Sequence, residues 1–223
     1  MINTPACLMV SRGIRILVLL LTIITALPLV GQQLLEGDLL FCCSDTANGI
    51  TTVTARSQDL PIDHVAVVHH IGGDSGPLFV IEAVKPVVCL TPIDTFLCEN
   101  GRVLVGRVNV DCDITASVKR CLRLVGKPYD DLYLQGDSAV YCSELVQMCF
   151  VTPSGLQVFE PVPMSFHDET MRVTDYWRAF YNDRGMEVPE GEPGSNPGEL
   201  SRREQVTILG WYQDECCGKE KSQ

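Results

Sequence analysis

Cys142 lies in the stretch DSAVYCSELVQMCF, residues 137–150, which has the hydrophobic pattern of a helix. Apolar side chains recur at positions i, i+3, i+4 and i+7, which places them on one helical face: Cys142, Leu145, Val146 and Cys149. Just upstream, Asp137 and Ser138 are residue types that favour the N-cap position. The pattern predicts that Cys142 points inward from the first or second turn, with Ser143 and Glu144 on the exposed side of that turn.

A cysteine in this position can have either of two roles. A thiol becomes a good nucleophile only when it is ionised, and both a helix N-terminus and a neighbouring imidazole favour the thiolate. Free cysteines are also common as small buried hydrophobic residues. The pattern around Cys142 leaves both roles open, so the choice depends on whether a base lies nearby.

His64 is the best-placed candidate for that base. It begins the apolar run HVAVVHHI, a predicted strand whose side-chain face continues through Ala66 and Val68. His69 and His70 end this strand beside glycines, and we expect them to be solvated; His167 lies in a polar loop. A lone histidine at a strand end is more often structural than catalytic, so a catalytic His64 needs a further partner.

Glu82 is a candidate for that partner. It is the one charged residue on an otherwise apolar face of the predicted strand LFVIEAV, residues 78–84. A buried carboxylate must be hydrogen-bonded or protonated, because burying an unpaired charge is costly. If the strands of His64 and Glu82 are neighbours, the carboxylate can orient the imidazole, and the imidazole can activate Cys142. The alternative, that Glu82 lies on an edge strand and faces water, fits the pattern equally well.

Short strands and a few helices would have to position these residues. Apolar runs bounded by Gly, Pro or polar residues predict strands at 37–43, 64–71, 78–84 and 102–110. Cap signals and apolar periodicity predict four helices. The first has Thr91 as its N-cap and Pro92 as its first residue, and the second is capped by Asp113 or Thr115. The other two begin near Cys142 and near residue 174. Strands clustered before and between helices indicate one α+β domain.

Several of these motifs, taken in order, resemble a known family. They are GDLLF, DHVAVV, VIEAV, GKPYD and YCSELVQMCF, within residues 37–150. The set is similar to the YiiX-type branch of the NlpC-like cysteine peptidase superfamily. The resemblance implies an α+β, circularly permuted papain-like domain with an antiparallel sheet packed on the nucleophile helix. It implies Cys142 as nucleophile, His64 as base and Glu82 as orienter. It also implies that three residues line or brace the cleft: Tyr141, Tyr129 and Asp130.

The same resemblance implies an activity. We expect a thiol hydrolase that cleaves amide bonds in peptide or cell-wall peptide substrates, through an acyl-enzyme on Cys142 and without a cofactor. Related permuted domains, such as lecithin retinol acyltransferases, act on acyl chains, so a lipid or acyl-group hydrolase or transferase is an alternative. An inactive relative that only binds its ligand is another. The formal net charge of −11, without a run of basic residues, argues against a nucleic-acid partner.

Residues 1–31 predict a signal peptide or an N-terminal anchor. Arg12 and Arg15 precede an uncharged apolar run at 16–30, and polar residues follow it. We therefore expect export, to the periplasm or out of a bacterial cell as the resemblance suggests, and a mature chain that begins near Gln32. No membrane contact is expected beyond this segment.

The rest of the chain divides by composition into two parts. Residues 32–184 carry the predicted strands, helices and motifs, and we predict one hydrolase domain there. Residues 185–223 begin with a connector rich in Pro and Gly and continue into a C-terminal tail, which we expect to pack on the domain.

The sequence contains 11 cysteines, which in an exported protein raises the question of disulfide bonds. Those among apolar residues are predicted to be buried thiols: Cys89, Cys121 and Cys149. The doublets Cys42–Cys43 and Cys216–Cys217 are the better candidates for disulfide bonds. They lack the C-x-x-C spacing of zinc sites, so no metal site is predicted. Cys142 should have no partner thiol, because Cys149 lies about 10.5 Å away along the helix axis.

Overall fold

The computed structural model describes residues 33–54, 60–73, 75–136 and 138–212. The predicted signal segment, residues 1–31, and the doublet Cys216–Cys217 lie outside these ranges, so both remain predictions. Among the helices that are described, none is long and apolar enough to cross a membrane.

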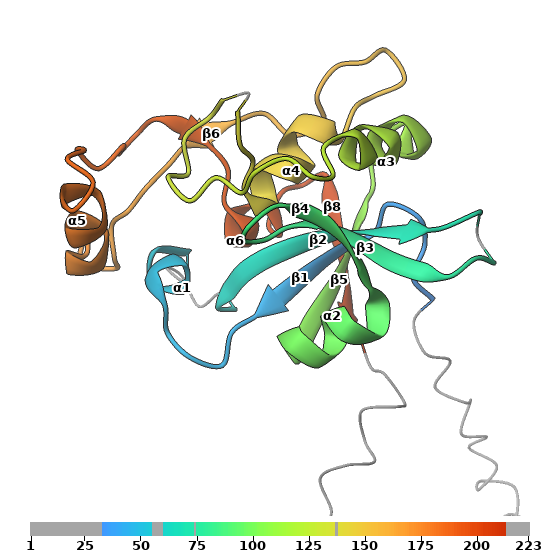
Figure 1. Cartoon of the computed structure of the whole chain (residues 1–223), viewed down its shortest axis with the longest axis horizontal. Coiled ribbons are helices and arrows are strands. Elements are labelled where there is room, and N and C mark those ends of the chain that lie inside the picture. Colours follow the sequence, from blue (N-terminus) through green and yellow to red (C-terminus); the bar gives the residue numbers. More distant parts are fainter. Residues whose placement is uncertain (1–32, 55–59, 74, 137, 213–223) are drawn as a thin grey trace, which may run out of the picture. The chain divides into compact units, whose positions relative to one another are not determined.

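A six-stranded antiparallel sheet forms the centre of the fold, in the order β4-β3-β2-β1-β5-β8 (Figure 1). The sequence pattern predicts four of these strands, and the structure adds β4 and β8. The strands are β1 (Leu39–Cys43), β2 (Ile62–His70), β3 (Leu78–Ala83), β4 (Val88–Pro92), β5 (Arg102–Val108) and β8 (Val206–Trp211).

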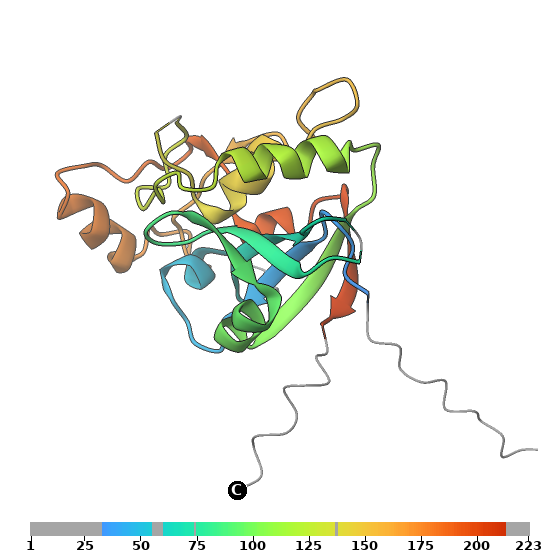
Figure 2. The same ribbon diagram turned by 45° about the vertical axis from the view of Figure 1, so that its right-hand side comes forward.

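Helices cover both faces of this sheet. Along β1, Leu39, Phe41 and Cys43 face α3 (Ile114–Arg123) and α4 (Cys142–Cys149), whereas Leu40 and Cys42 face α2 (Ile93–Asn100). This follows from the two-residue period of a strand. The two views show α3 and α4 on one side of the sheet and α2 on the other (Figures 1 and 2). The antiparallel sheet packed on the Cys142 helix, which the resemblance implies, is confirmed.

The prediction that Thr91 caps a helix is wrong. Thr91 lies in β4, and α2 begins two residues later at Ile93, with Pro92 as its N-cap. The reason is the pairing of β4 with β3, which continues to the pair Phe79 and Pro92 and keeps the chain extended up to that point. A local cap signal was outweighed by a strand partner from elsewhere in the chain.

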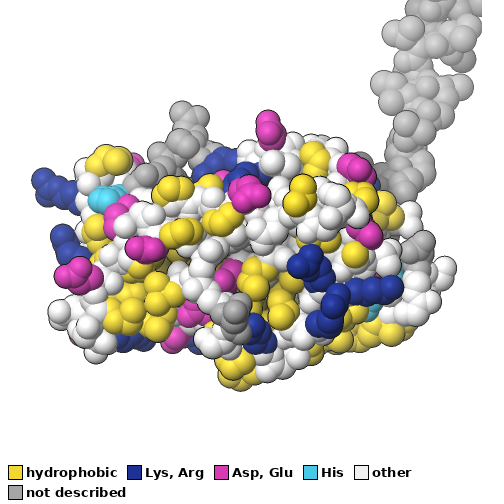
Figure 3. Space-filling view, turned by 90° about the horizontal axis from the view of Figure 1, so that it is seen from above, with side chains coloured by type: hydrophobic (Ala, Val, Ile, Leu, Met, Phe, Trp, Pro, Cys, Tyr) yellow, Lys and Arg dark blue, Asp and Glu magenta, His cyan; other side chains and the backbone are white. Residues whose placement is uncertain are grey.

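A cluster rich in aromatic residues forms a third hydrophobic core, smaller than the two that lie on the faces of the sheet. Its buried members come from α1 (Gly49–Thr54), α5 (Asp175–Asn182) and the loop before α5: Val53, Phe166, Trp177 and Tyr181. The Trp177 indole N–H donates to the Gly49 carbonyl at 2.9 Å, which ties α5 to α1. In a view onto α3 and α4, hydrophobic side chains gather on the part of this face toward α5 (Figure 3).

The C-terminal segment returns to the sheet and to α4. A two-stranded ladder pairs β6 (Val162–Pro163) with β7 (Pro193–Gly194), and α6 (Pro197–Leu200) follows. The last described strand, β8, then pairs with β5. This path brings residues 193–200 against the start of α4, which becomes important for the site.

The GDLLF motif is held by an ion pair between the buried Asp38 carboxylate and the partly exposed Arg107. Asp38 is 1% exposed, and its carboxylate accepts hydrogen bonds from Arg107 Nε and Nη2 at 2.7 Å each, and from the Leu35 backbone N–H at 2.8 Å. Gly37 precedes it with φ +78°, and a Cβ there would lie 2.7 Å from Ile114. The Gly-Asp pair is therefore required by backbone geometry and by charge pairing.

Replacing Asp38 should destabilise the fold. Because hydrogen bonds to charged groups contribute about 1.5–3 kcal/mol, Asp38→Ala should lower the free energy of unfolding by about 2–3 kcal/mol, measured by urea denaturation. Asp111→Ala, at an exposed loop position, is the control and should change it by less than about 0.5 kcal/mol. Equal effects of the two changes would contradict the assigned role of Asp38.

Candidate active site

Cys142 is the first residue of α4. Tyr141 is the N-cap in an extended conformation, and its backbone N–H donates to the carboxylate of Glu144 at 3.4 Å as part of a capping box. Backbone N–H groups in the first turn of a helix have no acceptor within the helix. They point toward the space in front of Cys142, where a developing negative charge can be stabilised.

The helix starts later than its cap signals suggest. Ser138 lies upstream of the helix, and Asp137 lies outside the described residues. Val140 forms a parallel bridge with Tyr129, so the chain is extended up to Tyr141 and cannot turn into a helix earlier. This late start places Cys142 at the helix N-terminus.

The prediction that Ser143 and Glu144 face solvent is wrong. Both are buried, with exposed fractions of 0% and 1%. Ser195, from the returning C-terminal segment, donates from its hydroxyl to the Ser143 hydroxyl at 3.0 Å, and its backbone N–H donates to the Tyr141 hydroxyl at 2.9 Å. Burial raises the pKa of Glu144 to about 7. A segment distant in sequence covers the helix side that would otherwise be exposed.

His64 and Glu82 meet on neighbouring strands. β2 and β3 are paired, and His64 Nε2 donates to Glu82 Oε2 at 2.7 Å. Glu82 is only 4% exposed, so the alternative in which it faces water is wrong. The pairing leaves His64 Nδ1 for a second partner.

Thr91 holds the other oxygen of the same carboxylate, and the sequence analysis missed this role. Its hydroxyl donates to Glu82 Oε1 at 2.5 Å. Glu82 pairs with Cys89 across the ladder, and Thr91 lies two residues further along the same strand face. If VCLTP is read as a strand that pairs with β3, Thr91 falls beside Glu82, and this placement predicts the bond. With both oxygens bonded, the carboxylate is fixed in orientation.

The imidazole of His64 also bonds to Cys142, and the surroundings favour its charged form. Burial opposes the charge, but hydrogen bonds and charge interactions with Cys142 and Glu82 outweigh burial and raise the pKa of His64 to about 10. Burial likewise opposes ionisation of Glu82, but its hydrogen bond with His64 prevails and lowers its pKa. A positive imidazole next to the sulfur favours the thiolate.

The raised pKa of His64 predicts the high-pH limb of the activity profile. Because the charged imidazole is lost as pH rises through its pKa, kcat/KM should fall in a limb centred near pH 10. Glu82→Gln removes the negative charge that favours the imidazolium, so the limb should move to lower pH. Glu36→Gln, which alters a carboxylate paired with His69 instead, should leave the limb in place. A limb that stays near pH 10 in Glu82→Gln would contradict this assignment.

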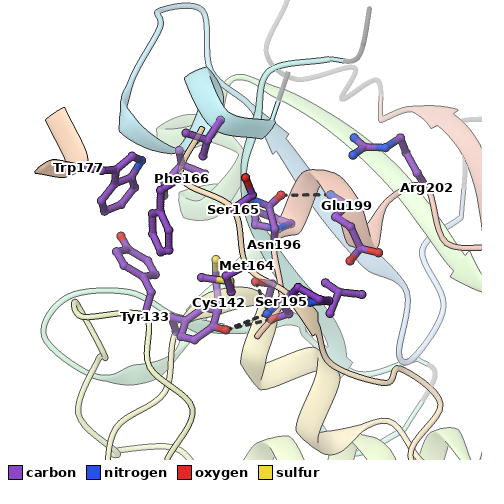
Figure 4. Close-up of a pocket in the computed structure, with 17 residues that line it drawn as sticks. Tyr133, Cys142, Met164, Ser165, Phe166, Trp177, Ser195, Asn196, Glu199 and Arg202 are labelled. Atoms are coloured by element: carbon purple, nitrogen blue, oxygen red, sulfur yellow. Dashed lines mark hydrogen bonds between the residues drawn. The ribbon is translucent and has the colours of Figure 1, made fainter. Parts of the chain in front are cut away.

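A pocket of about 180 Å³ opens beside Cys142 (Figure 4). Of the three residues expected to line or brace the cleft, Tyr141 lines it. Asp130 lies outside the lining. Its carboxylate accepts hydrogen bonds from the backbone N–H groups of Leu132 and Leu134 at 2.8 Å each, and these bonds fix the loop that leads to α4. The lining also includes four residues that the sequence analysis did not single out: Tyr133, Met164, Phe166 and Trp177.

Tyr129 is not among the pocket residues but contacts one of them. Its ring meets the Tyr133 ring edge-on at 6.5 Å, and the two hydroxyl groups are hydrogen-bonded. Burial raises the pKa of both phenols, that of Tyr133 to about 12, so both stay protonated. Tyr129 therefore supports the pocket wall from behind.

The other histidines are paired with carboxylates, and the prediction that His69 and His70 are solvated is wrong. His69 Nδ1 lies 2.9 Å from Glu36, and His167 Nδ1 lies 2.9 Å from Glu190. The side chain of His70 is only 10% exposed. Among the four histidines, all of which the structure describes, His64 is bonded to Cys142, so it is the histidine that the fold brings to the thiol.

All cysteines of the described region are free thiols. The prediction of a bond involving Cys42 and Cys43 is therefore wrong: both are buried, and burial raises the pKa of Cys42 well above its usual range and that of Cys43 to about 11. Cys121 and Cys149 are confirmed as buried thiols, whereas Cys89 is half-buried.

Comparison with known proteins identifies the family. A family model described as "Permuted papain-like amidase enzyme, YaeF/YiiX, C92 family" matches residues 33–209. The chain belongs to this family. It is therefore a cysteine-type hydrolase with a permuted papain-like α+β fold, as the resemblance implied.

Two similar proteins of the YiiX type support this assignment. The uncharacterized protein YiiX of Escherichia coli (strain K12) is 28% identical over 147 residues, which cover 64% of this chain and 70% of that protein. The crystal structure of metalloprotein yiiX from Escherichia coli O157:H7 superposes with a TM-score of 0.64 at 22% identity, over 80% of this chain and 98% of that one. At this level of identity the structural match establishes the fold.

Proposed function

We propose that this protein is an exported amidase in which Cys142 is the nucleophile, His64 the general base and acid, and Glu82 the orienter. The observation that carries the proposal is the position of the His64 imidazole, bonded to Glu82 on one side and to Cys142 on the other. Nucleophile, base and orienter in this order are the components of a catalytic triad.

The mechanism follows from this geometry. The thiolate of Cys142 attacks the carbonyl carbon. As negative charge develops on the carbonyl oxygen, this oxygen accepts a hydrogen bond from the backbone N–H of Cys142 at the start of α4. The His64 imidazolium then gives its proton to the leaving amine, which departs and leaves a thioester on Cys142. In the second half of the reaction, the neutral imidazole takes a proton from a water molecule while the water oxygen attacks the thioester carbonyl. The acid product leaves, and the thiolate of Cys142 and the imidazolium of His64 are restored.

Glu82 and Thr91 are positioning residues in this mechanism. The Glu82 carboxylate accepts a hydrogen bond from the Nε2–H of His64, and this bond keeps Nδ1 directed at Cys142. The Thr91 hydroxyl keeps the carboxylate from rotating. A fixed imidazole is needed because the same nitrogen must first return its proton to the leaving group and then accept one from water.

A peptide or cell-wall peptide outside the cytoplasm is the proposed substrate. The family description names an amidase, which supports amide cleavage. The basic and apolar segment within residues 1–31 motivates export. N-terminal sequencing of the protein recovered outside the cytoplasm should begin near Gln32, whereas an intact Met1 in a cytosolic fraction would contradict export.

No step of this mechanism uses a metal ion. One similar structure is described as that of a metalloprotein. In this chain, the described residues contain no group of three or more His, Cys, Asp or Glu side chains that could hold a metal ion. The side chains of the described residues therefore do not fit a metal centre, and the thiol of Cys142 supplies the nucleophile.

A second candidate function keeps the same residues but acts on acyl groups. The observation that favours it is the apolar character of the pocket wall, which includes Met164, Phe166 and Trp177. An ester or thioester would be attacked by Cys142 in the same way, with an alcohol or thiol as the leaving group.

A substrate panel separates the two functions. The purified protein is incubated with peptide amides, peptidoglycan-derived peptides, and ester lipids, and mass spectrometry follows the released products and any acyl group on Cys142. Cleavage of amides with a transient Cys142 adduct supports the amidase. Turnover of ester lipids alone would replace it with the acyl hydrolase, and modification of another cysteine instead of Cys142 would contradict both.

A further inference from the structure

We propose that the pocket beside Cys142 is a specificity subsite for one compact apolar group of the substrate, about the size of an aromatic ring or a branched aliphatic side chain. This inference rests on the proposed function, because the occupant is part of the substrate that Cys142 attacks. It adds a substrate class: molecules with a bulky apolar group next to the scissile carbonyl.

The lining of the pocket is apolar on one side of Cys142. In Figure 4, Tyr133, Phe166 and Trp177 lie on one side of the thiol, whereas Glu199 and Arg202 lie on the other. Helix α1 completes the apolar side with two aliphatic side chains: Ile50 and Val53. Pockets with apolar walls and a few polar groups are typical of small-molecule sites, and here the asymmetry places the apolar group on the aromatic side.

The size of the pocket limits what it can hold. Its volume is about 180 Å³. An apolar cavity of about 150 Å³ binds benzene, so one aromatic ring or one branched side chain fills this pocket. A long fatty-acyl chain has more than twice as many carbon atoms and does not fit within it.

The pocket gives access to Cys142. The Cys142 residue is only 3% exposed, and it is one of the residues that line the pocket. A group that occupies the aromatic side therefore lies directly beside the reacting sulfur. This proximity makes occupancy of the pocket a determinant of the reaction rate.

The aromatic wall is held rigidly. The Trp177 ring meets the Phe166 ring edge-on at 5.1 Å and the Tyr133 ring at 5.5 Å, and its indole N–H is bonded to Gly49. Tyr133 itself has φ 55°, a left-handed conformation that non-glycine residues seldom adopt. Strained residues of this kind concentrate at binding sites. The pocket is thus formed before the ligand arrives, which lowers the entropic cost of binding.

The test is a series of chloroacetamides that alkylate thiols with loss of chloride. N-methyl, N-benzyl and N-octyl chloroacetamides are compared on the full protein, with mass spectrometry reading modification of Cys142 and each rate divided by the rate with glutathione. We expect the N-benzyl reagent to react about tenfold faster than the N-methyl reagent, and the N-octyl reagent to show no further gain.

Filling the pocket should remove this preference. Ile50→Trp places a large ring into the α1 side of the pocket and should bring the benzyl-to-methyl rate ratio close to one. Ile208→Trp makes the same substitution at an exposed position of β8 and should leave both the ratio and the absolute rates unchanged. A benzyl-to-methyl ratio near one in the unmodified protein would overturn the proposal, as would a ratio that Ile50→Trp does not lower.

Failure of the subsite and failure of the proposed function give different results. If Cys142 reacts rapidly and cleaves amides but shows no benzyl preference, the subsite is wrong and the amidase stands. An octyl reagent that far exceeds the benzyl reagent would replace the compact group with a long acyl chain. Binding can also be tested without a reactive thiol. In saturation-transfer NMR with the Cys142→Ala protein and unreactive N-benzylacetamide, saturating the aromatic protons of the protein should transfer signal to the benzyl ring. Absence of this transfer would overturn the subsite.

Discussion

Cys142→Ala should abolish hydrolysis, with kcat reduced by a factor of about 10⁴ or more. Removing the nucleophile of a triad leaves only the contributions of substrate binding and of the oxyanion site, which is why the expected loss is so large. The measurement is the release of amine from the best amide substrate, together with the disappearance of the acyl adduct from the mass spectrum.

The matched control is a second buried cysteine of the same helix. Cys149 is 2% exposed and lies at the other end of α4, so Cys149→Ala makes the same chemical change at a comparable depth. It should lower stability modestly, because it shortens a buried side chain, and keep kcat within about twofold. Cys142→Ala protein that retains more than about 1% of the activity would contradict the nucleophile assignment.

His64→Ala should reduce kcat/KM by a factor of about 10²–10⁴, the range contributed by a positioned acid and base. The loss has two physical sources: the thiolate of Cys142 loses its positive partner, and the leaving amine loses its proton donor. Alkylation of Cys142 near neutral pH should slow for the same reason.

A histidine on the same strand supplies the comparison for this variant. His69 is also partly buried and also paired with a glutamate, Glu36, but it lies at the other end of β2. His69→Ala should therefore cost stability without changing kcat/KM or the pH dependence of alkylation. If the two alanine variants lose activity to the same extent, the effect is structural, and His64 is not the base.

Local patterns in the sequence were sufficient to predict much of this fold. The apolar runs of β1, β2, β3 and β5 and the periodicity of α4 depend on neighbouring residues, so they can be recognised without knowing the tertiary structure. The same holds for α3, where Asp113 accepts the Ala116 N–H at 2.8 Å as a local cap. The ordered motifs also led to the family and to three residues that the fold brings together: Cys142, His64 and Glu82.

Predictions failed where a partner distant in sequence changed the local preference. Thr91 has the signals of a helix cap, but ladder pairing with β3 holds it in a strand and turns its hydroxyl to Glu82. Ser143 and Glu144 read as exposed, but the segment around Ser195 returns from the C-terminal part and buries them. The segment around Ser195 cannot be found from a short window of sequence. Thr91 lies only nine residues from Glu82, but its role appears only when Val88–Pro92 are paired with β3.

The side chains that can do chemistry here, and the order of the elements that carry them, can be read from the sequence, because residue types and short-range periodicity are local properties. The packed fold brings His64 between Glu82 and Cys142, and it places an aromatic wall beside the thiol, built from α5, the loop between α3 and α4, and the loop between α4 and α5. Those contacts join segments far apart in the chain. Their free energy comes from burial and hydrogen bonding that exist only once the sheet and helices have packed.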